Sequence, residues 1–165
     1  MKANNDENFP IVSIFEDDPE TSCGSADVID SKHGPGQFLG VQVIDGPLKY
    51  GKIKFLDGIY IGDFDEESSN LRLGTFTYKN GKVASGVFED GELLTGTITF
   101  PDGRVFYSKD RFEEDDTYDG AMFEADGTWS QGTYDVETME QIGGWIFDAD
   151  GNVIWSVEFE SDEED

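Results

Sequence analysis

The chain is organised by glycines that recur at a nearly constant spacing. A strand-opening glycine lies seven residues before a turn glycine in five successive copies, and the opening glycines are 23, 22, 24 and 24 residues apart. The pairs are Gly51/Gly58, Gly74/Gly81, Gly96/Gly103, Gly120/Gly127 and Gly144/Gly151, and residues 40–46 form a partial copy. A period of this length indicates a repeat protein whose units stack on their neighbours to bury apolar surface.

The second copy shows what each unit is. Gly74, Phe76 and Tyr78 lie at every second position, so they share one face of an extended strand. Asn80-Gly81 follows, a dipeptide that tolerates the positive φ of a tight hairpin turn, and another β-prone run comes after it. Helical periodicity is nearly absent. The sequence therefore predicts an all-β, elongated array of antiparallel β-hairpins.

The last two copies differ from the others by one residue. Phe55, Tyr78 and Phe100 lie three residues before their turn glycine, whereas Phe123 and Phe147 lie four residues before theirs. Because successive side chains of a strand point to opposite faces, this slip sends the later aromatics to the other face, unless a longer turn or a bulge absorbs it.

Three motifs resemble the MORN repeat, a family of glycine- and aromatic-rich hairpins. Residues 60–64 (Tyr-Ile-Gly-Asp-Phe) match its first half, residues 86–96 its linked middle, and residues 100–103 (Phe-Pro-Asp-Gly) its end. The resemblance covers about residues 40–159. It implies a MORN-like repeat sheet and a scaffold function, and it also suggests association with membrane phospholipids, as in some MORN proteins.

The chain departs from the MORN pattern at a few positions. Ser108 and Ser156 stand where other copies have a glycine, and the links at residues 65–73 and 109–119 are longer and more acidic than in the family. These acidic links bear on the type of partner more than on the fold.

Charge narrows the range of partners. The chain has 37 acidic and 11 basic residues, and residues 105–165 alone carry 19 acidic and 2 basic ones, a net charge of −17. Such a field repels nucleic acid and anionic membrane surfaces and attracts basic protein surfaces. The prediction is therefore a basic protein partner, with no direct nucleic-acid contact and with anionic-membrane binding disfavoured. A homodimer is compatible with the repeat, although the like charge opposes it.

The compartment follows from cysteine usage and hydropathy. Cys23 is the only cysteine, so no disulfide within the chain can form, and no apolar run approaches the length of a membrane span. We expect a cytoplasmic protein, with the nucleus as the other option.

We expect three regions. Residues 1–36 form an N-terminal cap or partly disordered segment, with a short strand at 9–15 and a loop, cap or docking peptide at 20–36. Residues 37–159 form the MORN-like repeat domain, and residues 160–165 an acidic tail. The alternation of Val153, Trp155, Val157 and Phe159 predicts a core strand.

Catalytic and metal sites find little support. Cys23 and His33 would need further ligands to hold zinc, and nothing orients the imidazole as a base for the thiol. Residues 148–152 invite comparison with an EF-hand loop, but Ile146 and Val157 stand where that loop needs oxygen ligands. We expect no enzyme activity, no cofactor and no metal.

Two groups are candidates for partner binding, although both have a structural interpretation as well. The aromatic row is Tyr60, Phe64, Tyr78, Phe88, Phe100, Tyr134 and Trp155. The acidic group is Glu113, Glu114, Asp115, Asp116 and Asp119. Aromatics on an open sheet face supply desolvated contacts, while carboxylates steer a basic partner; otherwise the rings are core and the charges a solvated face.

The function expected from these features is a noncatalytic, acidic protein–protein interaction module or scaffold. The alternative is a nucleic-acid mimic that blocks a nuclease or another DNA- or RNA-binding protein, as an inhibitor, antitoxin-like or immunity protein does. A third option is an enzyme of unrecognised type, or the regulatory repeat part of one, although we expect no catalytic domain after the repeats.

Overall fold

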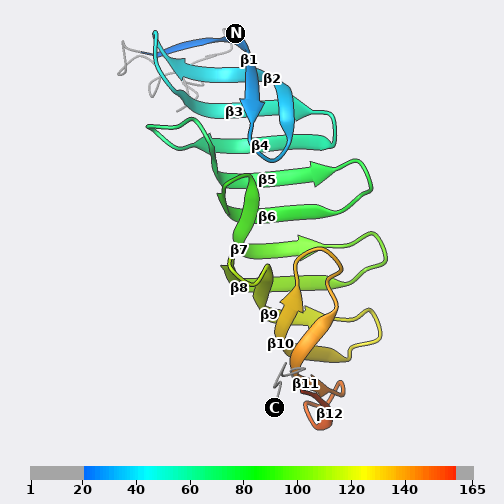
Figure 1. Cartoon of the computed structure of the whole chain (residues 1–165). Helices are drawn as coiled ribbons and strands as arrows, with labels where there is room; N and C mark the ends of the chain where they lie inside the picture. Colours follow the sequence, from blue (N-terminus) through cyan, green and yellow to red (C-terminus); the bar gives the residue numbers. More distant parts are fainter. Residues whose placement is uncertain (1–20, 159–165) are drawn as a thin grey trace, which may run out of the picture.

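The computed structural model describes residues 21–158, which form one antiparallel β-sheet of twelve strands. Each strand pairs with the next along the chain, and these residues contain no helix. The strands are β1 (Thr21–Asp30), β2 (Gly34–Val43), β3 (Leu48–Phe55), β4 (Gly58–Phe64), β5 (Leu71–Tyr78), β6 (Val83–Glu89), β7 (Glu92–Thr99), β8 (Val105–Phe112), β9 (Thr117–Phe123), β10 (Trp129–Asp135), β11 (Gln141–Phe147) and β12 (Val153–Val157). Figure 1 shows them stacked in chain order, which confirms the predicted elongated array of hairpins.

The sheet begins earlier than the sequence predicts. Residues 21–36, expected to be a loop or cap, instead form β1 and the start of β2, which pair from Thr21–Val43 to Asp30–Gly34. The strand expected at residues 9–15 and the tail at 160–165 lie outside the described residues.

One row of glycines crosses the sheet. Paired glycines lie opposite one another on neighbouring strands, and the row contains Gly24, Gly40, Gly51, Gly62, Gly74, Gly86, Gly96, Gly120, Gly132 and Gly144, with Ser108 in β8. At Gly96 an added Cβ would lie 2.1 Å from the Ser85 carbonyl oxygen of the next strand. At most positions of the row only glycine therefore allows the strands to approach this closely.

The core lies on one face of the sheet, here called the core face, and the opposite side is called the open face. The buried apolar residues are Phe38, Leu48, Ile53, Phe55, Tyr60, Phe64, Leu71, Phe76, Ala84, Phe88, Leu93, Ile98, Phe106, Tyr118, Met122 and Tyr134. Their rings lie over glycines of the same sheet: a Cβ at Gly51 would meet Phe38, and one at Gly120 would meet Phe106, both at 2.7 Å. The glycine row is therefore the floor on which the aromatic core packs.

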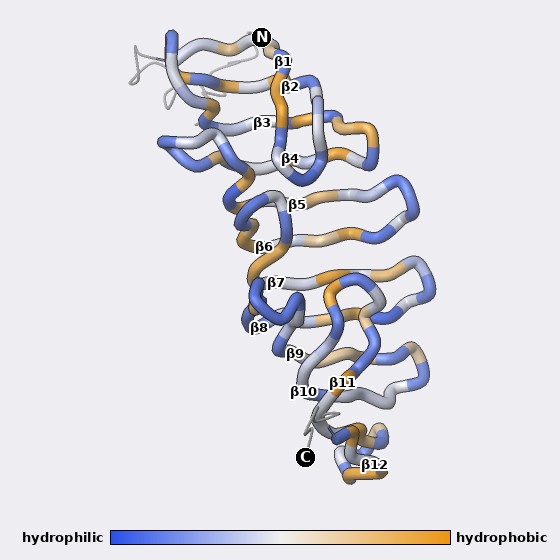
Figure 2. The backbone as a smooth tube through the Cα atoms, viewed as in Figure 1, coloured by the Kyte–Doolittle hydropathy of each residue, from blue (hydrophilic) through white to orange (hydrophobic). Residues whose placement is uncertain are grey.

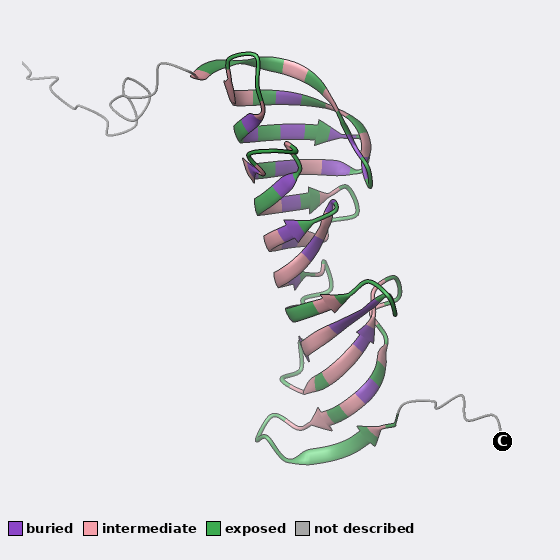
Figure 3. Ribbon diagram, turned by 60° about the vertical axis from the view of Figure 1, so that its left-hand side comes forward, coloured by how far each residue is buried: buried purple, intermediate pink, exposed green. Residues whose placement is uncertain are grey.

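Hydropathy and burial follow the same alternation. In Figure 2 the turns and links are mostly hydrophilic while apolar positions recur within the strands, and Figure 3 shows buried positions alternating with exposed ones. Strand β1 and the link after β10 complete the core, since Ala26 and Val28 of β1 and Val136 and Met139 of that link pack against it. The sheet thus covers part of its core with its first strand and one of its connections.

The one-residue slip moves the later aromatics to the other face. Phe55 is 3% exposed on the core face, whereas Phe123 is 41% exposed and pairs with Trp129 on the open face. Phe147 likewise pairs with Trp129. The expectation of a change of face is confirmed.

The last strand corrects a prediction. Val153 and Trp155, expected in the core, are 58% and 67% exposed, because β12 is the last strand of the described sheet and has a neighbour on one side only. A register shift between Ile146 and Phe147 places Val157, and not Ser156, opposite Gly144. Phe159 lies outside the described residues.

Candidate functional site

A ridge of stacked aromatic rings runs across the open face of β8–β11. We call Tyr107, Phe123, Trp129 and Phe147 the aromatic ridge. Successive ring centroids are 5.4, 5.7 and 4.0 Å apart, and the last three rings are nearly parallel, with interplanar angles of 10° and 12°. Their cross-strand register produces this stack, because Phe123, Trp129 and Phe147 are direct partners on β9, β10 and β11.

The ridge is accessible. Tyr107 is 50% exposed and Phe123 41%, while Trp129 and Phe147 are half-buried. Trp145, two residues before Phe147 on the same face, is 55% exposed. Exposed apolar clusters of this kind mark interaction sites in soluble proteins. Aromatic side chains are also the residues that most often carry binding energy in interfaces.

Carboxylates without cations border the ridge. Phe123 and Phe147 lead directly into hairpin turns that contain Glu124, Asp126, Asp148 and Asp150. From residue 112 to residue 158 there is no lysine, arginine or histidine. The cations just before this stretch, Lys109 and Arg111, reach only carboxylates at residues 92, 113, 116 and 119.

Local hydrogen bonds keep two of the turn carboxylates ionised. The hydroxyl and backbone N–H of Thr128 donate to Asp126 and lower the pKa of its carboxyl group. The backbone N–H of Asn152, and then its side-chain amide, lower the pKa of Asp148 in the same way. Asp126 is exposed and Asp148 is half-buried, so negative charge faces solvent beside the ridge.

The predicted aromatic row lies mainly in the core. Tyr60, Phe64, Phe88 and Tyr134 are 0–3% exposed on the core face, which matches the structural interpretation of the row. Tyr78 and Phe100 are half-buried at turns, and Trp155 is the exposed member of the row. The row is therefore not assembled as one open binding surface.

The predicted acidic group forms the link between β8 and β9 and the start of β9. Arg111 contacts Glu113 and Asp116, at 3.8 and 3.4 Å, and Lys109 contacts Asp119 at 3.7 Å. Glu114 and Asp115 are exposed. Part of the group is thus neutralised locally, while part presents free charge.

The aromatic ridge was not predicted as a site. The slip of Phe123 and Phe147, which moves their rings to the open face, is the sequence signal for it. Trp129, which directly follows a turn, becomes the cross-strand neighbour of both rings only through the register of the strands.

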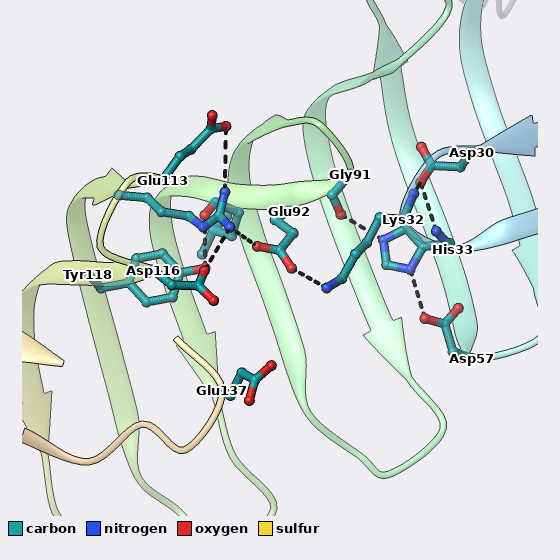
Figure 4. Close-up of polar contacts among 12 residues, drawn as sticks. Asp30, Lys32, His33, Asp57, Gly91, Glu92, Glu113, Asp116, Tyr118 and Glu137 are labelled. Carbon is teal, nitrogen blue, oxygen red and sulfur yellow. Dashed lines mark hydrogen bonds and ion pairs between the residues drawn. The ribbon is translucent and has the colours of Figure 1, made fainter. Parts of the chain in front are cut away.

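A second polar cluster lies on the core face, where the β1–β2 turn folds across the sheet (Figure 4). His33 is buried; its Nδ1 is 2.7 Å from Asp57 Oδ2 and its Nε2 is 2.7 Å from the carbonyl oxygen of Gly91. Each ring nitrogen thus has an oxygen partner within hydrogen-bond distance. This contact ties β1–β2 to the β6–β7 turn.

Ion pairs extend this cluster. Glu92 contacts Lys32 at 2.6 Å and also Arg111, and Arg111 continues to Asp116. Glu92 raises the pKa of Lys32 by a hydrogen bond and by its charge. A cavity of about 290 Å³ adjoins the cluster, but charges of both signs line it. We therefore regard the cluster as a clamp between strands.

The structure places Cys23 and His33, considered together in the sequence, in different surroundings. Cys23 is exposed, whereas His33 is buried with both nitrogens bonded. Residues 21–158 contain no group of three or more metal-ligating side chains. At the EF-hand-like turn, Asp148 accepts hydrogen bonds from Asp150 and Asn152.

Comparison with protein-family models finds no match, and comparison with curated proteins finds none either. In residues 21–158, no helix has the length and apolar character needed to cross a membrane.

Proposed function

We propose that this protein is a noncatalytic, strongly acidic interaction module, resembling MORN-repeat scaffolds, that binds a basic protein surface. The observation that carries the proposal is the aromatic ridge bordered by turn carboxylates that form no ion pair within the described residues. In the cell we expect it to act in the cytoplasm or nucleus.

The ridge and the carboxylates have separate tasks. The carboxylates attract a cationic partner over distance and raise the association rate, an effect that salt weakens. The ridge then supplies the contact that excludes water, since aromatic anchors surrounded by polar residues dominate binding energy. Affinity that persists at high salt would come from the ridge.

The net charge of the chain disfavours nucleic acids and anionic membranes as partners. A net charge of −26 repels both nucleic acid and the anionic membrane surface that the MORN resemblance suggests. Arginine and lysine side chains on a protein fit both parts of the site, because they pair with carboxylates and pack on aromatic rings.

The test is capture of basic proteins on the immobilised full-length chain, eluted by steps from about 0.15 M to about 1 M salt, over which the screening length falls from about 8 to about 3 Å. Trp145→Ser and Phe123→Ser alter the face that carries the ridge. Tyr50→Ser is the matched control, since Tyr50 is 56% exposed on the sheet but lies in β3.

We expect a partner that wild type and Tyr50→Ser retain at high salt and that both ridge-face variants lose. Equal retention by all three variants would overturn the proposal for this face. A reciprocal experiment with the purified partner would give the dissociation constants.

The second candidate, a nucleic-acid mimic, is favoured by the cation-free stretch from residue 112 to residue 158. A mimic needs its carboxylates at phosphate positions and gains little from the aromatic ridge. A competition experiment distinguishes the two functions. If the protein is a mimic, excess double-stranded DNA or RNA should displace it from its partner, because both occupy the same site. Capture of the partner that is unchanged in excess nucleic acid would support the scaffold function.

A further inference from the structure

The C-terminal edge of the described sheet has no protection against strand pairing. β12 reads Val-Ile-Trp-Ser-Val and contains neither charge nor proline. Val153, Ile154 and Trp155 are 58%, 57% and 67% exposed, and Figure 3 shows the strand as exposed along most of its length. Within residues 21–158, β11 is its only strand neighbour.

The other edge is different. β1 contains Asp27 and Asp30, and its last residue lies beside the turn that His33 holds on the core face. Edge strands are usually protected by charge, proline or cover, and terminal units of a repeat array usually present polar surfaces. β1 follows this rule, whereas β12 departs from it.

The surroundings of β12 indicate the chemistry of its partner. Residues 135–158 contain six carboxylates and no cation. Antiparallel pairing of β12 with the same strand of a second copy would bring the Asp148–Asp150 turn of one chain toward Glu158 of the other. Like charges would then meet across the new pair, so a second copy is a poor occupant.

A hollow beside the edge connects it to the open face. A volume of about 570 Å³ lies between Trp145 and Val157, and Gly132, Gly143 and Gly144 form part of its wall. Because the glycines carry no side chains, the hollow can take a side chain from a strand placed next to β12. It lies beside Trp145, whose face also carries the aromatic ridge.

We propose that β12 receives an extended, lysine- or arginine-bearing segment of the partner protein as a thirteenth strand. The inference rests on the proposed function and adds the place and form of binding. Backbone groups of the segment pair with the free edge of β12, as in other complexes formed by strand addition. Alternate side chains reach the hollow, and its cations lie near Asp148, Asp150 and Glu158.

The probe is a synthetic peptide of about ten residues that alternates lysine with valine or threonine, a typical strand length. Its control is the same peptide N-methylated at alternate residues, which keeps charge and side chains but removes the donors of one edge. Binding to the full-length chain is measured by fluorescence anisotropy, and amide hydrogen exchange locates the protected strand.

We expect the unmodified peptide to bind about tenfold more tightly than the methylated one and to slow exchange at β12 but not at β1. Trp155→Thr should weaken binding about tenfold. Ile29→Thr should not, although Ile29 is 86% exposed on the opposite edge.

Three results would overturn the proposal. The first is that both peptides bind with equal affinity, or that neither binds. The second is that the peptide slows hydrogen exchange at β1, or only on β8–β11. The third is that the protein forms a concentration-dependent dimer in which β12 is protected from exchange without peptide. In the first two cases the ridge-face capture experiment still decides the proposed function by itself, so the two failures can be told apart.

Discussion

The turns of the earlier and later copies share the same backbone hydrogen bond, but the aromatic rings beside them lie on opposite faces of the sheet. Each turn closes with a hydrogen bond of 2.8–2.9 Å from the backbone N–H of its first residue to the carbonyl of its fifth: Tyr78–Lys82, Phe100–Arg104, Glu124–Thr128 and Asp148–Asn152. In the first two turns the first residue is aromatic, and in the last two it is acidic.

The earlier turns satisfy their own charges. Lys82 lies 4.3 Å from the centre of the Tyr78 ring, and Arg104 lies 4.7 Å from that of Phe100. The later turns replace these cations by Thr128 and Asn152, and their aromatics move to the open face. A shift of one residue thus changes a closed, structural turn into an exposed ring beside unpaired carboxylates.

The largest expected effect comes from substitutions in the glycine row, which the earlier and later copies share. Gly96→Ala and Gly132→Ala would place a Cβ 2.1 and 2.0 Å from a neighbouring carbonyl oxygen, at φ angles of 143° and 147°. Each should lower the free energy of unfolding by about 3 kcal/mol or more in urea denaturation. Gly24→Ala is the control, since no atom lies within 4 Å of its added Cβ. Equal stability of all three variants would disprove the role of the glycine row.

A second prediction concerns the earlier half alone. His33→Ala should cost about 2 kcal/mol, because the buried carbonyl of Gly91 loses its hydrogen-bond partner on the ring. Asp57→Asn should cost less, since the asparagine side chain keeps an oxygen that can accept a hydrogen bond. Hydrogen exchange should increase in β1–β2 and at the β6–β7 turn while β10–β12 stay unchanged; a uniform increase along the sheet would contradict a local clamp.

Alkaline pH tests the buried tyrosines of both halves, of which Tyr118 belongs to the later one. Burial raises the pKa of Tyr118 from 10.0 to about 12, and burial also raises the pKa of Tyr60 and Tyr78. The folded state therefore holds these protons more tightly than the unfolded state does. The resulting stability is complete below pH 10 and is lost as pH rises toward 12, by about 2 kcal/mol for Tyr118. Denaturation of wild type and Tyr118→Phe at pH 8 and above pH 11 measures it; the loss should be smaller in the variant.

Exchanging two residues tests the slip directly. Phe123→Glu combined with Glu124→Phe recreates the earlier pattern in a later turn, so the ring should leave the open face. We expect a folded sheet by circular dichroism and about tenfold weaker partner binding. The converse exchange, Thr99→Phe with Phe100→Thr, adds a ring beside the ridge and should not weaken binding. If neither exchange changes affinity, the face of the aromatic is irrelevant to the partner.

The smallest effect concerns the cations of the earlier turns. Lys82→Ala and Arg104→Ala should each lower the free energy of unfolding by about 0.5–1 kcal/mol, the usual size of a cation–π contact at a surface. Lys79→Ala, an exposed neighbour, should change stability less. Thermal denaturation of the three variants makes the comparison.

The repeated hairpins could be predicted because glycine spacing and turn dipeptides are local features. Strand β1 was not predicted, since residues 21–30 contain neither the glycine spacing of the repeats nor a regular apolar alternation. Pairing with β2 and the contacts of the following turn, through His33, hold that strand, and such contacts across 58 residues are not visible in a local pattern.

The sheet face of a side chain could be predicted from the sequence, but the strands that lie next to it could not. The slip of Phe123 and Phe147 correctly gave the change of face, but alternation in residues 153–157 could not show that the described sheet has no strand beyond β12. The acidic group was found from composition, whereas the aromatic ridge depends on register between strands. The partner roles of these residues stay predictions.

The clamp at His33 also has a mechanical meaning. Most contacts in the sheet join adjacent strands, so tension on the two ends of the chain would open hairpins one at a time. His33 and Glu92 instead connect the β1–β2 turn to the start of β7, across the five strands β2–β6. Tension on this part of the sheet therefore acts on several hydrogen bonds at the same time. Under force, the C-terminal hairpins would peel away first and leave the clamped N-terminal strands as a stiff remainder.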